Sequence, residues 1–415
     1  MNATGATFDV LHELRAICGD ENARERPVGG VYVSPATAEE VAAVLRLANE
    51  RRLSVGCSGG STEFNATKLH VDIVLHTNRL TEVEHYDHAD LTVGIGAGTT
   101  IAQLNAMVGC DQLLFGGDPS LPERCTVGGL LATAAHGPMR HGFGGVRDYC
   151  IGVRFVTGDA RRAKGGGRVV KNVAGYDLMK LLIGSYGTLA VITSASFKLF
   201  PAPRQTRTFL AEFATAKDAL SFRDLLMRSP LSPMCLELVS PSARKIMRPE
   251  MEQDAWVMCV RAAGSDAVLA RYRKELGSAV TRQLESDGEI KMWRAIGDFA
   301  VASALRHFHV NVRSSDVLSA VDTLNSIAGM AGIDLGVIGR VGIGHLLVAV
   351  LGATTEASAG IDALISVLHT RFTDIGIKVE GASNPWPIPP MNLGSMRAVK
   401  QALDPNNVLR GRQIS

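Results

Sequence analysis

Apolar residues recur with helical spacing twice in the first quarter of the chain, each time just after a threonine that can cap a helix. After Thr37 they stand at positions i, i+3, i+4 and i+7 over residues 41–48, and after Thr100 they mark one side of residues 101–108. A Glu or Gln three residues beyond each threonine completes a capping box. The pattern therefore predicts two helices, each with one buried face.

Short apolar runs rich in β-branched residues predict strands at 53–56, 72–76, 92–95, 234–239, 256–261, 307–312 and 346–350. A further helix is predicted over 216–226. Strands, helices and Gly-rich turns alternate along the chain, which is typical of an α+β fold. A Rossmann domain is disfavoured, because no G-x-G-x-x-G follows the first strand and the nearest sequence, at 94–98, lacks the third glycine at the required spacing.

The length of 415 residues predicts two or three domains. Hydrophobic residues make up 46% of the chain and charged residues 20%, the balance of a globular protein without a disordered block. The net charge of +2 is near neutral, and Lys and Arg are scattered along the sequence. We therefore expect no nucleic acid partner.

The first twenty residues predict a short helix rather than a secretory signal, because no continuous apolar run follows a basic start. The most apolar later stretch, 333–353, contains Asp334, Arg340 and His345, which would be costly in a bilayer, and its β-branched residues favour buried strands. Seven widely spaced cysteines without a C-x-x-C predict reduced, mostly buried thiols in a cytoplasmic protein. They also exclude an all-cysteine iron–sulfur site within the chain.

The first of three glycine-rich clusters follows the predicted strand at 53–56 and contains Ser58, Gly59, Gly60, Ser61 and Thr62. Consecutive backbone N–H groups in such a loop can form a concave anion site that suits a pyrophosphate. Taken alone, a loop of this composition is more often an ordinary exposed turn.

The second cluster spans 116–144 and includes a Thr-x-Gly-Gly sequence at 126–129. Two glycines at the start of a small-residue helix leave room for a ring or a phosphate, and free N–H groups at the helix N-terminus favour negative charge. The third cluster lies within 169–192, the stretch around which the chain is organised. Its glycines at 184 and 187 allow the backbone to approach a flat ligand, because glycine has no Cβ.

The sequences KNVAGYDL at 171–178 and GSYGTL at 184–189 resemble the FAD-binding subunits of bacterial glycolate oxidases, in the vanillyl-alcohol-oxidase or PCMH-type flavoprotein superfamily. The resemblance is close over 29–203, weak over 205–385, and returns at the C-terminus. Three clusters in the family's order and spacing together favour FAD binding over three unrelated turns.

The resemblance implies three parts: a PCMH-type FAD-binding domain of two α+β subdomains at 1–204, an α+β cap domain at 205–385, and a C-terminal segment at 386–415 that returns to the FAD domain. The sequence changes character after Pro203, in agreement with the first boundary. In the last part we expect a helix to end at Asp404-Pro405, since proline disfavours helix in the residue before it. Arg410 stands where the family usually has proline.

In the family, the first loop and the T-x-G-G segment grip opposite sides of the FAD pyrophosphate, and the strand after the third turn meets the flavin. Carried onto this chain, the implied FAD contacts are Ser58, Gly59, Gly60, Ser61, Thr62, Pro119, Thr126, Gly128, Gly129, Thr133, Gly137, Gly187, Thr188 and Ile192. Relatives that attach the flavin covalently usually have a histidine at the position of Ser61, so we expect non-covalent FAD. Cys125 is an alternative attachment point, although an ordinary buried thiol is the simpler interpretation.

The cap supplies no clear catalytic residue. Catalytic relatives in the D-lactate and glycolate branch hold a metal with an H-x-G-x-G-N-x-H segment, but here Arg340 and Leu347 replace the two ligand histidines. His307 and His309 would share one face of a strand, yet two ligands without a third make a poor metal site. We expect no metal and assign no catalytic residue. Arg340 or His345 could bind or deprotonate an acid, with a structural role equally open.

The function implied by the resemblance is that of an FAD-binding subunit in a glycolate oxidase-like 2-hydroxy-acid dehydrogenase complex, supporting the oxidation of glycolate to glyoxylate. It would work beside a catalytic flavoprotein subunit and an iron–sulfur subunit, in the cytoplasm or at the inner face of the cytoplasmic membrane. Two alternatives stay open: a stand-alone FAD-dependent oxidoreductase of unknown substrate, and a flavin-free subunit that stabilises a complex.

Overall fold

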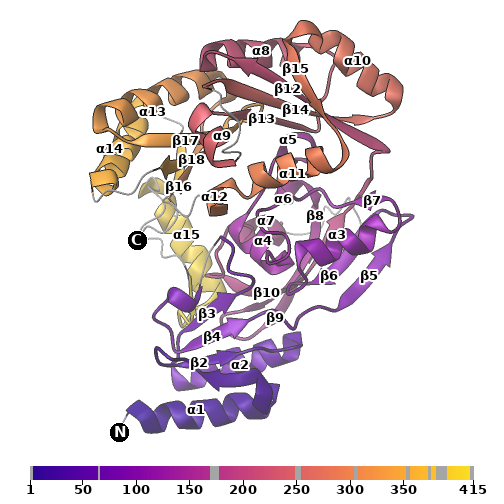
Figure 1. The fold of residues 1–415 in the computed structure, drawn as a ribbon. Helices are drawn as coiled ribbons and strands as arrows, with labels where there is room; N and C mark the ends of the chain where they lie inside the picture. Colours follow the sequence, from indigo (N-terminus) through magenta and orange to yellow (C-terminus); the bar gives the residue numbers. More distant parts are fainter. Residues whose placement is uncertain are drawn as a thin grey trace. The chain divides into compact units, whose positions relative to one another are not determined.

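The chain folds into two compact units, shown in Figure 1. The first comprises Met1–His136, Gly144–Ala202 and Ile388–Ser415, and the second comprises Gly137–Phe143 and Pro203–Pro387. The computed structural model describes residues 3–63, 66–168, 177–247, 254–302, 307–351, 356–372, 375–379 and 390–411. Most of the KNVAGYDL sequence, residues 171–176, lies outside the described residues.

One sheet of the first unit is mostly parallel. Its strands, in spatial order, are β1 (Ala23–Glu25), β2 (Val31–Val33), β4 (Ile73–His76), β3 (Val55–Ser58) and β20 (Leu409–Arg410). All neighbours are parallel except β1 and β2. The helices α1 (Ala3–Cys18) and α2 (Ala38–Arg51) bury apolar side chains against this sheet.

The other large sheet of the first unit is antiparallel. Its order is β5 (Val83–Asp87), β6 (Thr92–Gly96), β10 (Ala190–Lys198), β8 (Cys150–Thr157) and β9 (Arg162–Gly166). Its apolar core is shared with α3 (Ile101–Gly109), α4 (Val127–Thr133), α6 (Val146–Tyr149) and α7 (Leu178–Leu182). A small pair, β7 (Leu113–Leu114) and β11 (Phe200–Pro201), completes the unit together with α15 (Pro390–Leu403).

The second unit is built on one eight-stranded antiparallel sheet. The strand order is β15 (Val280–Leu284), β12 (Gln205–Phe213), β14 (Trp256–Gly264), β13 (Cys235–Val239), β17 (Asp334–Arg340), β18 (His345–Leu351), β16 (His307–Asn311) and β19 (Gly376–Val379). Apolar residues of one sheet face share a core with α8 (Ala216–Arg228), α10 (Asp266–Leu276), α13 (Val317–Ala331) and α14 (Glu356–Arg371). Shorter helices of this unit are α5 (Arg140–Phe143), α9 (Pro241–Met247), α11 (Ser286–Gly297) and α12 (Phe299–Ala302).

The α+β fold class predicted from the sequence is confirmed by this mixture of sheets and helices. Thr37 and Thr100 cap α2 and α3 as expected, because each side chain accepts a hydrogen bond from the N–H three residues on. The predicted strand at 53–56 lies two residues later, at β3. The helix α15 ends at Leu403, directly before Asp404-Pro405. Among the described helices, none is both long and apolar enough to cross a membrane.

Candidate functional site

The glycine-rich clusters meet at one cavity of the first unit, which we call the Gly-loop cavity. Its lining is Cys57, Ser58, Gly59, Gly60, Ser61, Thr62, Glu63, Thr77, Thr126, Gly128, Gly129, Ala132, Thr133, Tyr186, Gly187, Ala190, Val191 and Ile192. Three walls supply these residues: the loop after β3, the start of α4, and the turn that leads into β10.

The first wall lies so close to the second that side chains would not fit between them. An ideal Cβ on Gly60 would stand 1.6 Å from the carbonyl oxygen of Arg124, and one on Gly59 would stand 2.3 Å from Oγ1 of Thr126. The guanidinium of Arg124 also donates to the carbonyl of Gly60 over 3.2 Å. Only glycine allows this approach, so the two walls fix each other.

The backbone of the first wall has hydrogen-bond donors that the described protein does not use. Within the described part of the chain, no protein acceptor takes the N–H groups of residues 59–62. Ser61 has a φ of 55°, in the left-handed region, and its Oγ lies 3.2 Å from Oγ of Ser58. A run of unbonded N–H groups around such a residue forms an anion-binding concavity. The first wall is therefore a candidate site for a phosphate group.

The second wall contributes space rather than free N–H groups. The N–H of Val127 donates to Thr99, that of Gly128 donates to Ala97, and that of Gly129 donates to Oγ1 of Thr126. The expectation of free N–H groups at the start of this helix is therefore wrong, because neighbouring loops already accept them. A Cβ on Gly129 would meet only Oγ1 of Thr126, at 3.1 Å, so this glycine leaves the cavity open.

The third wall is a turn with left-handed glycines. Gly184 and Gly187 have φ values of 84° and 72°, which disfavour other residues. A Cβ on Gly187 would stand 3.2 Å from Cβ of Cys57 on the first wall. The first residues of β10, up to Ile192, continue the lining. The turn and the first loop thus approach each other across the cavity.

Three of the predicted FAD contacts do not line the Gly-loop cavity. Pro119 is buried elsewhere in the first unit, and Gly137 belongs to the second unit. Thr188 turns away, because its Oγ1 donates to the carbonyl of Ser185 and its own carbonyl accepts from Lys400. The other predicted residues, from Ser58 to Ile192, line the cavity, and their contact with FAD stays a prediction.

Sequence reasoning missed several lining residues, including Cys57, Thr77, Ala132 and Tyr186. The sequence could have predicted Ala132 as a lining residue, because it lies one helical turn after Gly128. Burial raises the pKa of the Cys57 thiol to about 12, and likewise that of Cys125. Both thiols are therefore neutral and weak nucleophiles near neutral pH. Cys125 is buried and is not among the lining residues.

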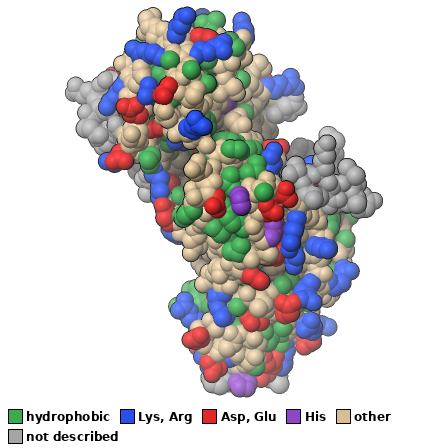
Figure 2. Space-filling view, turned by 90° about the vertical axis from the view of Figure 1, so that its right-hand side faces the viewer, with side chains coloured by type: hydrophobic (Ala, Val, Ile, Leu, Met, Phe, Trp, Pro, Cys, Tyr) green, Lys and Arg blue, Asp and Glu red, His purple; other side chains and the backbone are tan. Residues whose placement is uncertain are grey.

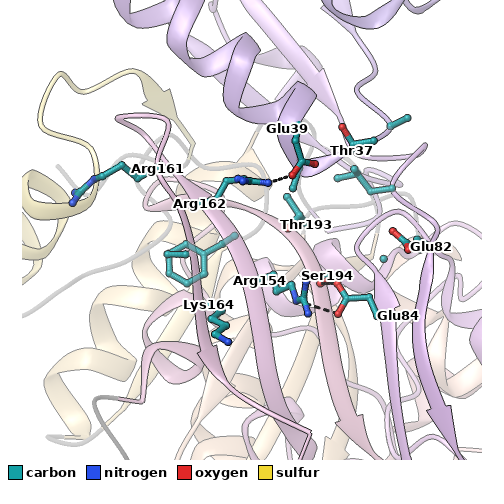
Figure 3. A pocket seen from close by; sticks show the side chains of 16 residues that line it. Thr37, Glu39, Glu82, Glu84, Arg154, Arg161, Arg162, Lys164, Thr193 and Ser194 are labelled. Carbon is teal, nitrogen blue, oxygen red and sulfur yellow. Dashed lines mark hydrogen bonds and ion pairs between the residues drawn. The ribbon is translucent and has the colours of Figure 1, made fainter.

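A larger groove of about 920 Å³ in the first unit has a different character, shown in Figure 3. It lies between the start of α2 and the strands β8, β9 and β10, with acidic and basic side chains facing each other. Arg154 pairs with Glu84 over 3.1 Å, and Arg162 pairs with Glu39. Its charges thus largely satisfy each other, and it lacks a glycine-built wall. The Gly-loop cavity is therefore the candidate cofactor site.

In the second unit, two histidines and an asparagine form a hydrogen-bonded chain. Nδ1 of His345 lies 2.9 Å from Oδ1 of Asn311, whose Nδ2 faces the carbonyl of Gly376 at 3.5 Å. Because the amide oxygen only accepts, Nδ1 of His345 carries the proton and its Nε2 accepts from Nδ1 of His309, 3.3 Å away. A neutral His309 then presents a lone pair on Nε2, a buried atom without a hydrogen-bond partner in the described structure.

The electrostatic surroundings keep His309 neutral. Burial lowers the pKa of His309 well below its ordinary value, and Lys378 and the neighbouring histidines add to this effect. Arg340 lies next to His345 in the sheet register and forms a buried ion pair with Glu237, 3.3 Å away. No group of three or more His, Cys, Asp or Glu side chains suited to a metal occurs among the described residues. The neutral histidine pair is therefore a candidate base.

Comparison with known proteins bears on both units. Residues 30–164 match the family model described as an FAD binding domain. The chain is 38% identical to a D-lactate dehydrogenase of Archaeoglobus fulgidus over 55% of this chain and 51% of that protein. It is 34% identical to the glycolate oxidase subunit GlcE of Escherichia coli over 37% and 44% of the two chains. The chain thus spans about half the length of these relatives.

Other matches extend over the whole chain at lower identity. The glycolate oxidase subunit GlcD of Bacillus subtilis is 23% identical over 97% of this chain and 96% of its own length. The solved structure of p-cresol methylhydroxylase superposes with a TM-score of 0.77 at 14% identity, over 97% of this chain and 96% of that one. At such identity the structural match shows the fold alone.

Residues 30–164 are similar to FAD-binding domains, and the chain has the fold of p-cresol methylhydroxylase and of a 4-ethylphenol oxidase. The predictions of this fold and of FAD as cofactor are confirmed. The finer assignment to glycolate oxidase subunits is not unique, because D-lactate dehydrogenases match equally well.

Proposed function

We propose that this chain carries non-covalent FAD in the Gly-loop cavity and serves the oxidation of a small 2-hydroxy acid. The observation that carries the proposal is the cavity itself, where glycines hold three backbone walls together around unbonded N–H groups. The relatives support the substrate class, because their names include D-lactate, glycolate and D-2-hydroxyglutarate.

In this proposal each wall has a separate role. The N–H groups of residues 59–62 bind the pyrophosphate, and the missing side chain of Gly129 leaves room beside it. The turn at Gly187 and the start of β10 bring backbone against the flavin. Bound FAD supplies a two-electron acceptor, while the protein's part is to hold and orient it.

We further propose that the chain is the FAD-binding subunit of a glycolate oxidase-like complex. The match to GlcE supports this, as does the replacement of both metal-ligand histidines of the catalytic relatives by Arg340 and Leu347. A catalytic flavoprotein subunit and an iron–sulfur subunit would then complete the electron path, at or near the inner face of the cytoplasmic membrane. The isolated chain would hold FAD without turning over the acid.

Anaerobic mixing of the purified chain with glycolate, D-lactate and D-2-hydroxyglutarate tests this proposal. We expect the flavin absorption to persist with every acid and to bleach once the two partner subunits are co-purified with the chain. Bleaching of the isolated chain would overturn the subunit role. Absence of flavin absorption, even after FAD is supplied, would instead favour the flavin-free stabilising subunit.

A stand-alone oxidoreductase is the second candidate, and the lone pair on Nε2 of His309 favours it. A neutral imidazole can remove the hydroxyl proton of a 2-hydroxy acid, and the hydrogen-bonded chain through His345 keeps that nitrogen unprotonated. If the isolated chain bleaches with an acid, we expect His309→Ala to stop the bleaching and His307→Ala, on the same strand face, to retain it. Both variants should keep FAD.

A further inference from the structure

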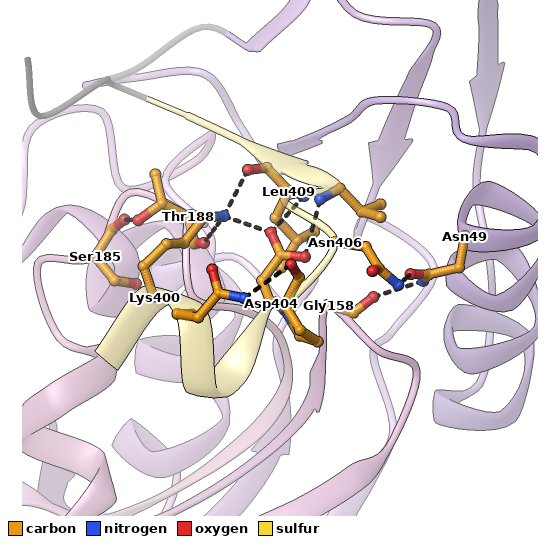
Figure 4. Close-up of polar contacts among 11 residues, drawn as sticks. Asn49, Gly158, Ser185, Thr188, Lys400, Asp404, Asn406 and Leu409 are labelled. Carbon is orange, nitrogen blue, oxygen red and sulfur yellow. Dashed lines mark hydrogen bonds and ion pairs between the residues drawn. The ribbon is translucent and has the colours of Figure 1, made fainter. Parts of the chain in front are cut away.

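The C-terminal segment reaches the Gly-loop cavity's third wall through one side chain, Lys400 on α15. Figure 4 shows its ammonium directed at the carbonyls of Thr188 and Leu409, 2.7 and 2.9 Å away, and at the carboxylate of Asp404. An ammonium has three N–H donors, so each is used. The Lys400 side chain is 24% exposed and that of Asp404 is fully buried. Lys400 and Asp404 therefore form a partly buried ion pair that also holds the backbone of Thr188.

The carbonyl of Thr188, which accepts from Lys400, belongs to the turn that lines the Gly-loop cavity. The N–H and Oγ1 of Thr188 both donate to the carbonyl of Ser185, over 3.0 and 2.6 Å, which closes the turn from inside. The carbonyl of Thr188 points the other way and is held by Lys400. Gly187 lies between these two attachments and faces the cavity. Lys400 thus fixes the outer side of the turn whose inner side meets the ligand.

The same segment contacts the turn a second time at Gly411. An ideal Cβ there would stand 2.4 Å from the carbonyl oxygen of Tyr186 and 2.6 Å from Cγ2 of Thr188. The carbonyl of Tyr186 is backbone, and Cγ2 belongs to a Thr188 side chain that is held by its hydrogen bond to Ser185, so neither atom has much freedom to withdraw. The C-terminal segment therefore contacts the turn at two places, Lys400 and Gly411.

Asp404 extends this contact to the first wall. Its carboxylate accepts the N–H groups of Val408 and Leu409, over 2.9 and 2.8 Å, and so sets the path of the chain into β20. Leu409 pairs with Val55 in β3, and β3 leads directly into the loop that begins at Ser58. One segment thus contacts both the first and the third wall of the Gly-loop cavity.

We propose that Lys400 is a positioning residue for FAD, which keeps the Ser185–Thr188 turn at the distance from the first loop that the cofactor needs. This inference rests on the FAD site proposed above. Nothing in the sequence marks Lys400 for this role, because it lies more than two hundred positions after the turn and belongs to no glycine cluster.

The test compares FAD retention by full-length variants. Lys400→Met removes all three donors at similar length, Lys400→Arg keeps the charge, and Gly411→Ala presses on the turn while leaving Lys400 in place. Asn406→Ala is the matched control, since it removes a contact of the same segment with Asn49, 2.8 Å away, that does not reach the turn. The dissociation constant of FAD comes from flavin fluorescence on serial dilution, and the melting temperature of each apoprotein is measured in parallel.

We expect Lys400→Met and Gly411→Ala each to raise the dissociation constant at least tenfold, Lys400→Arg to recover most of the affinity, and Asn406→Ala to bind like the wild type. Wild-type affinity in Lys400→Met would overturn the inference. So would an equal loss of affinity in Asn406→Ala at the same apoprotein stability, because that would indicate a general effect of tail docking. If Lys400→Met does not fold, Gly411→Ala decides. A wild-type chain that retains no FAD would instead refute the FAD site itself.

Discussion

Gly128 and Gly129 are neighbours in sequence but serve the cavity in different ways. A Cβ on Gly128 would stand 3.0 Å from Cβ of Ala97, so this glycine is required for packing of α4 against the loop after β6. A Cβ on Gly129 would meet only the hydroxyl of Thr126. Neither glycine has a positive φ, so the argument at Gly129 is one of volume and not of backbone strain.

We predict that Gly129→Val abolishes FAD retention and leaves a folded apoprotein, because its side chain would fill space that the cofactor occupies. Gly109→Val is the matched control: it also lies in a helix, and a Cβ there has no neighbour within 4 Å. Circular dichroism and flavin fluorescence on the same samples measure both effects. A folded Gly129→Val protein with stoichiometric FAD would place the second wall away from the cofactor.

His309 gives a prediction about pH. Its pKa in the folded protein lies well below the ordinary value, because burial disfavours the imidazolium. As the pH falls through about 6.5 the unfolded chain gains a proton that the folded chain does not, so stability present above that pH is lost below it, by up to about 1.4 kcal/mol per pH unit. Denaturant unfolding of the wild type should show this slope, and His309→Leu should show a smaller one.

The comparison for this prediction is an exposed histidine. His88 lies on the surface of the first unit, so His88→Leu is the control for the loss of a histidine outside the buried cluster. The charged and titratable groups that face His309 are Lys378, His345, His307 and Arg340, and both variants retain them. An unchanged slope in His309→Leu would show that this imidazole titrates normally.

At the scale of single elements, α3 and α4 allow a matched pair of cap mutations. Each helix begins with a threonine whose side chain accepts an N–H three residues on. Thr126→Ala and Thr100→Ala should each lower the unfolding free energy by about 1 kcal/mol. Only Thr126 also lines the Gly-loop cavity, so we expect only its variant to weaken FAD binding.

Chemical denaturation and FAD titration of both proteins check this prediction. Wild-type FAD affinity in both variants would mean that the cap of α4 matters for stability alone. Equal losses of affinity would mean that FAD binding follows global stability and not the local wall.

The elements that the sequence predicted well are those specified locally. The threonine caps at Thr37 and Thr100 and the Asp404-Pro405 stop each involve a few neighbouring residues, and the structure has the corresponding helix ends. Of the two caps, the full capping box is formed only at Thr100, because the Glu40 side chain accepts from the N–H of Ala36 instead of that of Thr37. The pairing of β20 with β3 joins residues far apart in the chain, and no periodic pattern encodes it. The carbonyls of Ala97 and Thr99 accept hydrogen bonds from N–H groups of α4. The sequence did not predict these contacts, for the same reason.

The residues of the candidate site also differ in whether local sequence could predict them. Glycines signalled all three walls, because a glycine is needed where backbones meet, as the structure shows at Gly59 and Gly60. Lys400 and the contact between His309 and His345 carry no such signal, since a lysine or a histidine is common at many surfaces. Which of them come together is decided only by the tertiary fold.

At the scale of the whole molecule, the attachment of FAD is a property that one measurement on the intact chain can decide. Ser61 occupies the position where covalent relatives usually have histidine, and its hydroxyl lies against that of Ser58. The nearby thiols Cys57 and Cys125 are kept protonated by burial, with pKa values raised to about 12. None of these side chains is a competent nucleophile towards the flavin near neutral pH.

We therefore predict that acid denaturation of the yellow protein releases all FAD into the supernatant, and that the intact mass of the chain is that of the unmodified polypeptide. A parallel sample of a protein known to hold flavin covalently is the control for complete precipitation. Colour that stays with the pellet, with an added flavin mass, would contradict the prediction. Cys57→Ser and Cys125→Ser would then identify the attachment, and because Cys57 lines the cavity while Cys125 does not, Cys57 is the thiol to test first.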